Sequence, residues 1–383
     1  MEAHARTRSC ERACTLVRSV QAAARNNLRS SGDQSAVLPF RVSGESAYSP
    51  KVPNFFLVGA PKAGTTALYR YLDQHPGIYM SPIKEPNFLA NEIRLENFTD
   101  RFRQMGELRL AAQAEYLRGA VSEKFSGGPI SDWSDYLKLF QCARDESAIG
   151  EASACYLWSE TAPGNIASRF PDARILMILR NPIERALSQY AHMLSFTERR
   201  ISFREYMDTA LRSNSTRIGE LYPFLRFGLY YEQVKRYQSA FAADRIQIHF
   251  YEDFTRDPRS VLRAIFRFLS VDTDFAPDLS NRHMEASVPR FFFVKNALNR
   301  LGVWHAVRGR LPAGLRSRLR GVAFQPRNDI TLESADRTSL AKYYRDDIDN
   351  LARLLNRDLS AWFDAGAVGS DTSRNKREAF RMR

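Results

Sequence analysis

The segment 53–74 places a short apolar run, a glycine-bounded loop and an amphipathic stretch directly after one another. Residues 53–59 read PNFFLVG, and an apolar run of this length closed by glycine is typical of a buried parallel strand. From Gly64 onward, leucines and tyrosines recur at helical spacing, and the pattern stops before Pro76. Strand, tight loop and helix in immediate succession predict the front half of a βαβ unit.

The same alternation recurs along the chain. The apolar runs 174–179 and 245–251 have the length of strands, and each leads into a helix that starts at a proline, Pro182 or Pro258. Residues 148–150 predict a further, shorter strand. The sequence therefore predicts the α/β class, with a P-loop-like central parallel sheet flanked by helices in a single large domain.

The two ends of the chain differ from this middle part. We expect residues 1–50 to be a disordered basic segment, although its arginines among alanines and serines also resemble an organelle transit peptide. The folded domain is expected over 51–364, with its last helix at 338–356, and residues 365–383 are expected to form a basic tail. No apolar run approaches the ~20 residues needed to cross a bilayer, and no secretory signal is visible, so we expect a cytoplasmic location.

The charge balance bears on the partners of the chain. There are 56 Lys and Arg against 43 Asp and Glu, a formal net charge of +13. Such a balance suits nucleic acid, acidic lipid, an acidic glycan or a phosphorylated small ligand without choosing among them. For the basic stretch Arg308–Arg320 we weigh contact with an anionic membrane against a solvated helix face. Four cysteines in 383 residues exclude a disulfide-stapled scaffold.

The loop Gly59–Thr66 carries the first chemical indication. Backbone N–H groups at the start of a helix lack partners and attract anions, and the two glycines let the chain turn close to a phosphate. Their spacing matches the P-loop G-x-x-x-x-G-K-[ST], yet Thr65 follows Gly64, and the lysine, Lys62, lies inside the loop. The displaced lysine indicates a phosphate chemistry different from that of nucleotide triphosphatases.

This loop resembles that of a known family. Residues 61–66, PKAGTT, are similar to the 5′-phosphosulfate loop of sulfotransferases that use 3′-phosphoadenosine 5′-phosphosulfate (PAPS), and residues 180–190, RNPIERALSQY, are similar to their 3′-phosphate block. An arginine at the C-terminal end of a strand is placed to fork onto a phosphate. The resemblance implies that PAPS is bound by Lys62, Ala63, Gly64, Thr65, Thr66, Arg180 and Ser188, with Phe227 against the adenine. Core packing is the alternative role for Phe227.

Weaker matches follow in the family's order. Residues 84–89 (KEPNFL), 150–157 (GEASACYL), 228–233 (GLYYEQ) and 251–258 (YEDFTRDP) resemble segments of the carbohydrate-type sulfotransferases. Two positions depart from the pattern: Asn87 stands where the family often has histidine, and Ala152 stands where the glycosaminoglycan enzymes often carry lysine. With Asn87, a histidine base is not available at that position. Ala152 disfavours a heparan-like acceptor and fits the simpler bacterial-type members, whose acceptors include sugars, lipids and natural products.

The resemblance also assigns the chemistry of transfer. In-line displacement at sulfur requires stabilisation of the leaving phosphate oxygen, the role expected of Lys62, and removal of a proton from the acceptor hydroxyl, the role expected of Glu85. We expect a cleft lined by Phe88 and tyrosines to raise the pKa of Glu85 toward its working range. No motif has metal-ligand spacing, and the resemblance likewise implies transfer without a metal ion. The expected partners are PAPS and a hydroxyl-bearing sugar, glycolipid or natural product.

Two other classes of function stay open on the residues alone. A P-loop kinase or nucleotide hydrolase shares the strand–loop–helix unit, but no apolar strand here ends in a clear magnesium-binding aspartate. A nucleotide- or nucleic-acid-binding protein without catalysis would account for the positive charge and would bind nucleic acid with a steep salt dependence. The combined motifs favour a sulfotransferase that does not act on nucleic acid.

Overall fold

The computed structural model describes residues 51–194, 201–219, 221–280 and 332–363, and the backbone of two short antiparallel strands, β6 (Ser287–Pro289) and β7 (Phe324–Pro326). Three predictions fall outside these residues: the disordered segment 1–50, the membrane contact of Arg308–Arg320 and the basic tail 365–383. Within the described ranges, no helix combines the length and the apolarity that a membrane span requires.

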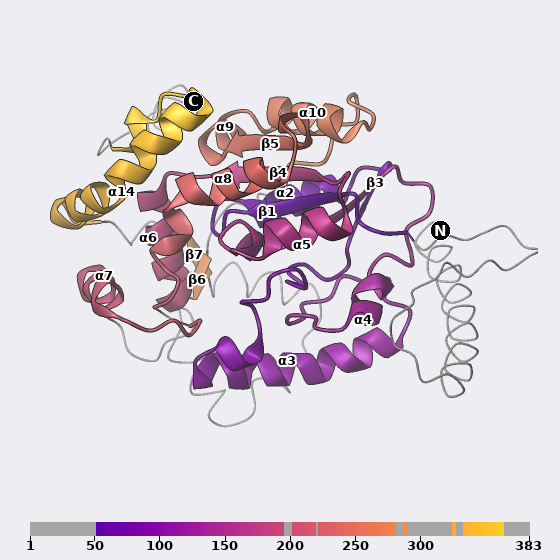
Figure 1. The fold of residues 1–383 in the computed structure, drawn as a ribbon, viewed down its shortest axis with the longest axis horizontal. Coiled ribbons are helices and arrows are strands. Elements are labelled where there is room, and N and C mark those ends of the chain that lie inside the picture. The colour runs from indigo at the N-terminus through magenta and orange to yellow at the C-terminus, as the bar shows by residue number, and fades with distance from the viewer. Residues whose placement is uncertain are drawn as a thin grey trace, which may run out of the picture.

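A five-stranded parallel sheet forms the centre of the molecule (Figure 1). Its strands are β1 (Phe55–Gly59), β2 (Ile78–Met80), β3 (Ala148–Ala152), β4 (Arg174–Leu179) and β5 (Ile246–Phe250), in the order β2-β3-β1-β4-β5. Every residue of β1 and β3 is buried, as expected for strands covered on both faces. A Cβ at Gly150 would lie 2.1 Å from the ring of its pairing partner Phe55, so only glycine lets that ring pack against β3.

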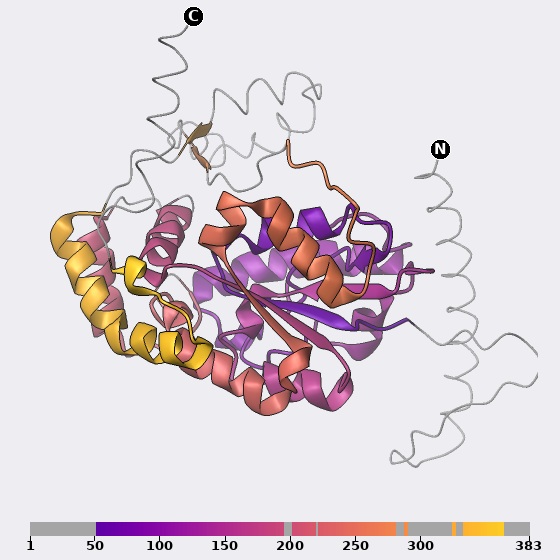
Figure 2. The same ribbon diagram turned by 90° about the horizontal axis from the view of Figure 1, so that it is seen from above.

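Helices cover both faces of this sheet, with α2 and α10 on one face and α5 and α8 on the other (Figure 2). The helices that surround the sheet are α2 (Thr65–Leu72), α5 (Ala162–Arg169), α6 (Pro182–Leu194), α8 (Tyr230–Ala240), α9 (Tyr251–Arg256), α10 (Pro258–Leu269) and α14 (Ser334–Leu355). Three more are α3 (Asp100–Arg118), α4 (Trp133–Lys138) and α7 (Phe203–Arg212). Short 3-10 segments are η1 (Leu95–Asn97), η2 (Ala154–Tyr156), η3 (Arg226–Gly228), η4 (Ala243–Arg245) and η5 (Ser360–Trp362).

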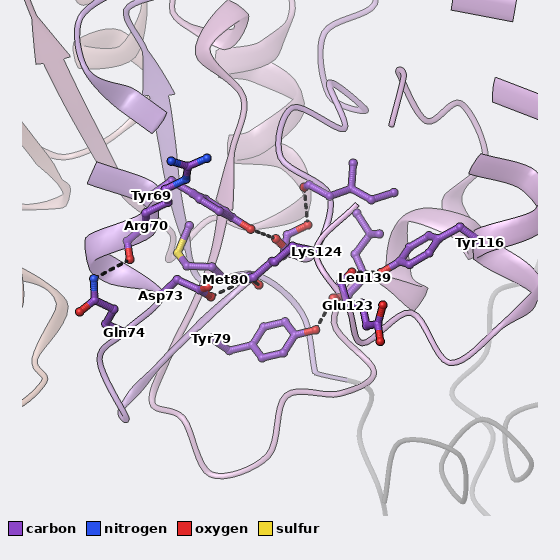
Figure 3. A network of polar contacts seen from close by, with 12 residues as sticks. Tyr69, Arg70, Asp73, Gln74, Tyr79, Met80, Tyr116, Glu123, Lys124 and Leu139 are labelled. Carbon is purple, nitrogen blue, oxygen red and sulfur yellow. Dashed lines mark hydrogen bonds and ion pairs between the residues drawn. The ribbon is translucent and has the colours of Figure 1, made fainter. Parts of the chain in front are cut away.

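The edge strand β2 and the chain that follows it are tied to α2 by a polar network (Figure 3). Lys124 Nζ donates to the Asp73 carboxylate at 2.6 Å and to the carbonyl of Met80 at 3.0 Å. The hydroxyl of Tyr69, on α2, donates to the carbonyl of Ser81 at 2.7 Å. The segment after β2 is therefore held against the helix that starts at the loop Gly59–Thr66.

The predicted α/β class with a central parallel sheet is confirmed. The short strand expected at 148–150 extends to Ala152, and the final helix expected over 338–356 already begins at Ser334. The sequence pattern does not reveal β2, because three residues are too few to show an alternation. It does not reveal α3 either, because that helix buries only three of its nineteen residues and so shows no clear apolar stripe.

Candidate active site

All five strands run parallel, so their C-terminal ends lie along one edge of the sheet. The chain leaves β1 toward β2 on one side and leaves β4 toward β5 on the other. Ligands of open α/β sheets bind in the crevice at such a reversal. The loop Gly59–Thr66 follows β1 and Arg180 follows β4, so the two predicted phosphate elements lie on either side of this reversal.

The loop Gly59–Thr66 has the conformation of an anion-binding turn. Lys62 and Gly64 have φ angles of 66° and 91°, and the N–H of Ala60 donates to the carbonyl of Ile178 on β4 at 2.7 Å. Among the described residues, no side chain caps the N-terminus of α2, and its first turn contains no acidic residue. The helix dipole and the N–H groups of that turn therefore provide a site that suits a phosphate or sulfate oxygen.

Arg180 joins the loop Gly59–Thr66 to the start of the block 180–190. Its Nη1 donates to the carbonyl of Lys62 at 3.1 Å, and its guanidinium lies over the ring of Tyr251, 4.4 Å from the centroid. The same ring packs against Gly64, where a Cβ would lie 3.0 Å from the Cδ2 of Tyr251. From α8, the hydroxyl of Tyr230 donates to the carbonyl of Arg180 at 2.9 Å. Arg180 and the loop thus form one packed unit around the ring of Tyr251.

The helix α6 begins directly after Arg180 and is fixed at its first turn. The Asn181 Oδ1 accepts from the N–H of Ile183 at 2.9 Å, and the N–H of Asn181 donates to the Glu252 carboxylate at 2.9 Å. Ser188 lies two turns along the helix on its buried side and is 4% exposed. In the block 180–190, Arg180 therefore precedes the helix at the end of β4, and Ser188 lies on the buried side of the helix.

Phe227 lies beside the start of α6. It belongs to η3, and the neighbouring Gly228 packs so closely on Pro182 that a Cβ would lie 2.9 Å from the proline ring. The Phe227 ring is buried, contacts Trp158 edge-on at 5.7 Å and has the guanidinium of Arg185 at 5.9 Å from its centroid. The rings of Phe227 and Trp158 thus lie near the start of α6, and Trp158 is the more exposed of the two.

Glu85 lies in the segment Lys84–Leu89, which follows β2. Its backbone has a left-handed φ of 64°, and its N–H donates to the carbonyl of Ala152 at the end of β3, at 2.8 Å. The Glu85 carboxylate pairs with Lys84 Nζ at 2.5 Å, and 43% of the Glu85 side chain is exposed. The carboxylate is therefore held at the C-terminal edge of the sheet and is accessible to a ligand.

The pKa of Glu85 moves in the direction opposite to our expectation. The charge of Lys84 is the largest cause and lowers the pKa, burial acts the other way, and Lys62 and His192 lower it further. The expected rise is wrong because the sequence shows the apolar neighbours of Glu85 but not the direction of the lysine side chains. Since Lys62 influences the pKa, the two residues expected to act in transfer lie within electrostatic reach of each other.

Phe88, which we expected to line a cleft beside Glu85, is part of the core. Its ring is 9% exposed, stacks on Tyr136 at 4.6 Å and contacts Trp133 at 5.6 Å. These ring contacts pack the segment Lys84–Leu89 against Trp133 and Tyr136. Phe88 therefore anchors this segment to the interior.

Sequence reasoning gave no role to Tyr251, Trp158, His192 and Glu151, which the structure places around these elements. Tyr251 and Glu151 lie in the matched segments 251–258 and 150–157, which is the signal that could have identified them, whereas Trp158 and His192 lie outside the matched segments. Burial raises the pKa of Glu151 to about 7. Among the described residues, no three His, Cys, Asp or Glu side chains gather as a metal site.

Comparison with known proteins agrees with this geometry. The profile of the sulfotransferase family matches residues 53–275. Carbohydrate sulfotransferase 15 from Rattus norvegicus is 26% identical over 267 residues, covering 57% of this chain and 44% of the relative. The bifunctional heparan sulfate N-deacetylase/N-sulfotransferase 3 from Homo sapiens is 26% identical over 314 residues, covering 80% of this chain and 30% of the relative. The chain thus spans less than half the length of these curated relatives.

One solved structure is similar over its whole length. The sulfotransferase from Alicyclobacillus acidocaldarius superposes with a TM-score of 0.59 at 30% sequence identity, covering 82% of this chain and 100% of that chain. The profile match over more than half of the residues and this likeness in fold agree with the resemblance of the loop Gly59–Thr66 and the block 180–190. The chain belongs to the sulfotransferase family.

Proposed function

We propose that this sulfotransferase moves a sulfuryl group from PAPS to a hydroxyl of an acceptor that contains a carbohydrate. The observation that carries the proposal is the 3.1 Å hydrogen bond from Arg180 Nη1 to the carbonyl of Lys62. This bond holds the candidate 3′-phosphate residue against the candidate 5′-phosphosulfate loop, so one nucleotide with both groups fits the two elements together. The names of the relatives, a carbohydrate sulfotransferase and a heparan sulfate N-sulfotransferase, support a carbohydrate acceptor.

The residues of the loop Gly59–Thr66 and Arg180 fit this donor. The uncapped start of α2, from Ala63 to Thr66, offers N–H and hydroxyl donors to the phosphosulfate end, and Arg180 offers a planar fork to the 3′-phosphate. Ser188 and Phe227 complete the proposed donor site. When bound, PAPS supplies an activated sulfuryl group. Lys62 stabilises the negative charge on the leaving phosphate oxygen, a role that its position inside the loop assigned to the phosphosulfate supports.

Glu85 accepts the proton of the acceptor hydroxyl. The ion pair with Lys84 keeps its carboxylate ionised, which is the form that a base requires. A lowered pKa also makes the carboxylate a weak base. When the acceptor hydroxyl takes the place of Lys84 Nζ at the carboxylate, the charge of Lys84 moves away and its hydrogen bond is lost, so both effects of Lys84 on the pKa weaken and the basicity of Glu85 rises during the encounter.

A cavity of about 230 Å³ beside this segment supports an acceptor with an apolar face. Its walls include Phe98, Phe102, Met105, His192, Met193 and Tyr206. Two observations link the cavity to Glu85: the N–H of Ile130, next to the wall residue Pro129, donates to the carbonyl of Pro86 at 2.8 Å, and the charge of His192 acts on Glu85. The C–H face of a sugar ring, or the apolar part of a glycolipid, packs against such a wall.

Binding of the donor is tested by thermal stability in EDTA. The desulfonated nucleotide 3′,5′-diphosphoadenosine (PAP) is expected to stabilise the protein by about 2.7 kcal/mol at a hundredfold excess over Kd, and 5′-AMP and ATP much less. Stabilisation by ATP only after magnesium is added, with none by PAP, would favour the kinase or hydrolase alternative. Salt-dependent binding of DNA or RNA that PAP does not displace would favour the nucleic-acid-binding alternative.

Transfer is tested with radiolabelled PAPS and a panel of free sugars, aryl glycosides and glycolipids. We expect label on a hydroxyl of the sugar, with lower KM for the acceptors that carry an apolar group. Glu85→Gln is expected to keep PAP binding and to lower turnover, whereas the control Glu115→Gln, an exposed carboxylate paired with Arg118 on α3, should not. Wild-type turnover in the Glu85 variant would contradict its role as the base.

A further inference from the structure

Glu151, on β3, is a carboxylate in the interior of the protein. Its side chain is 0% exposed. Oε2 accepts hydrogen bonds from the hydroxyls of Tyr136 at 2.6 Å and Tyr156 at 3.1 Å, and Oε1 accepts from the Ser153 hydroxyl at 2.6 Å. Burial of a carboxylate is costly unless hydrogen bonds compensate for it. A glutamate at this buried position therefore suggests a role beyond core packing.

Two of these three hydroxyls continue to the segment that carries Glu85. The N–H of Asn87 donates to Ser153 Oγ at 3.1 Å, and the N–H of Leu89 donates to the hydroxyl of Tyr156 at 3.1 Å. A hydroxyl that accepts a backbone N–H and donates to a carboxylate is oriented by both contacts. Glu151 is therefore the common acceptor at the end of two hydrogen-bond chains that start in the backbone of residues 87 and 89.

The segment with Glu85 needs such support because its backbone is unfavourable. Glu85 and Asn87 have φ angles of 64° and 51°, in the left-handed region that side chains with a Cβ rarely occupy. The side-chain amide of Asn87 closes the turn by donating to the carbonyl of Glu85 at 2.9 Å. Conformations of this kind persist only where the surroundings fix them. The two chains to Glu151 are among the contacts that do so.

We propose that Glu151 is a positioning residue, which acts through Ser153 and Tyr156 to hold the backbone of residues 85–89 so that the Glu85 carboxylate faces the acceptor. This inference rests on the proposed function, in which Glu85 is the base. Tyr136 donates to the same carboxylate, and among the described residues its hydroxyl makes no hydrogen bond to the backbone of residues 85–89; its ring stacks on Phe88, and Tyr136→Phe keeps that ring while it removes the hydroxyl. The chain thus contains a matched control within one network.

The experiment compares Ser153→Ala and Tyr156→Phe, each of which cuts one chain, with Tyr136→Phe, which removes a hydrogen bond to Glu151 and leaves both chains in place. We expect the first two to lower kcat by about tenfold or more with PAP affinity kept within about twofold, because misplacement of a reacting group affects the chemical step. Tyr136→Phe is expected to stay within about twofold of wild type in kcat. Equal kcat for all three variants would overturn the proposal.

Hydrogen exchange provides a readout that needs no turnover. Peptides that contain residues 85–90 should exchange faster in Ser153→Ala than in Tyr136→Phe, while the peptide of the loop Gly59–Thr66 exchanges equally in both. Unchanged exchange in residues 85–90 would refute the positioning role even if the enzyme transfers sulfuryl groups. If residues 85–90 exchange faster in Ser153→Ala but the wild-type protein transfers no sulfuryl group from PAPS, the proposed function is refuted and the structural role of Glu151 stays intact.

Discussion

Arg180→Ala removes the side chain that joins the two halves of the proposed donor site. It deletes the hydrogen bond to the carbonyl of Lys62 and the contact with the ring of Tyr251, together with the fork proposed for the 3′-phosphate. The contacts with Lys62 and Tyr251 are present without ligand, so the loss of PAP affinity comes from the fork: a hydrogen bond to a charged group contributes about 1.5–3 kcal/mol, and a 3′-phosphate left without its partner adds to that cost. We therefore expect PAP binding to weaken by about 2–4 kcal/mol, which is roughly 30- to 700-fold in Kd.

Calorimetric titration with PAP and with 5′-AMP distinguishes the two ways in which Arg180 can act. If the guanidinium binds the 3′-phosphate, Arg180→Ala loses most of the preference for PAP over 5′-AMP, and Arg180→Lys keeps part of it because the charge is retained without the fork. If Arg180 only holds the loop Gly59–Thr66, both ligands weaken equally. Arg118→Ala, at an exposed arginine on α3, is the control. A Kd for PAP within about threefold of wild type would refute the reasoning.

Further predictions concern single residues of the site. Lys62→Ala is expected to lower kcat roughly 10²–10³-fold in the radiolabel assay, since the leaving oxygen loses its charge partner. Gly64→Ala should lower the free energy of unfolding in urea by roughly 1–3 kcal/mol, because φ is 91° and a tyrosine ring lies at 3.0 Å from the new Cβ, whereas Gly164→Ala, with nothing within 4 Å, should not. The lowered pKa of Glu85 means that its ion pair is present above the ordinary glutamate pKa and is lost as pH falls through the lowered value, so a pH profile of kcat/KM should show no acid limb from Glu85 above about pH 5. The pKa of Glu151 rises from 4.5 to about 7, so its contribution to stability is fully present below 4.5 and is lost as pH rises through 7. Glu151→Gln should therefore flatten the fall in unfolding free energy over that interval, by about 3 kcal/mol, in denaturation at several pH values.

The parallel sheet and the loop Gly59–Thr66 could be predicted from sequence because their signals are local. Apolar runs of strand length alternate with helices, and two glycines with a lysine between them mark a tight turn from a strand into a helix. Arg180 was placed correctly at a strand end because β4 is continuous and apolar up to Leu179. Where the pattern was short, as in β2, or spread over an exposed helix, as in α3, the sequence carried no signal.

The environment of Glu85 could not be predicted, because it depends on contacts between segments that are distant in sequence. The pKa of Glu85 is set mainly by the direction of the Lys84 side chain. In an irregular segment, the side chains of adjacent residues can point to the same side or to opposite sides. Glu151 looked like one more residue of a matched segment. The role proposed for Glu151 depends on Tyr136, fifteen residues earlier, and on the backbone of residues 87 and 89. Only the folded chain brings these groups close to Glu151.

The position of α3 has a consequence for how such an enzyme diversifies. The proposed donor residues follow strands of the sheet, whereas Phe102 and Met105, in the wall of the cavity beside Glu85, belong to α3, which lies apart from the sheet in Figure 1. Under the proposed function, the residues after the strands are constrained by PAPS, whereas the stretch around α3 is free to vary between members. Exchange of the stretch around α3 between members is expected to redirect transfer to a different hydroxyl while the affinity for PAP is inherited unchanged.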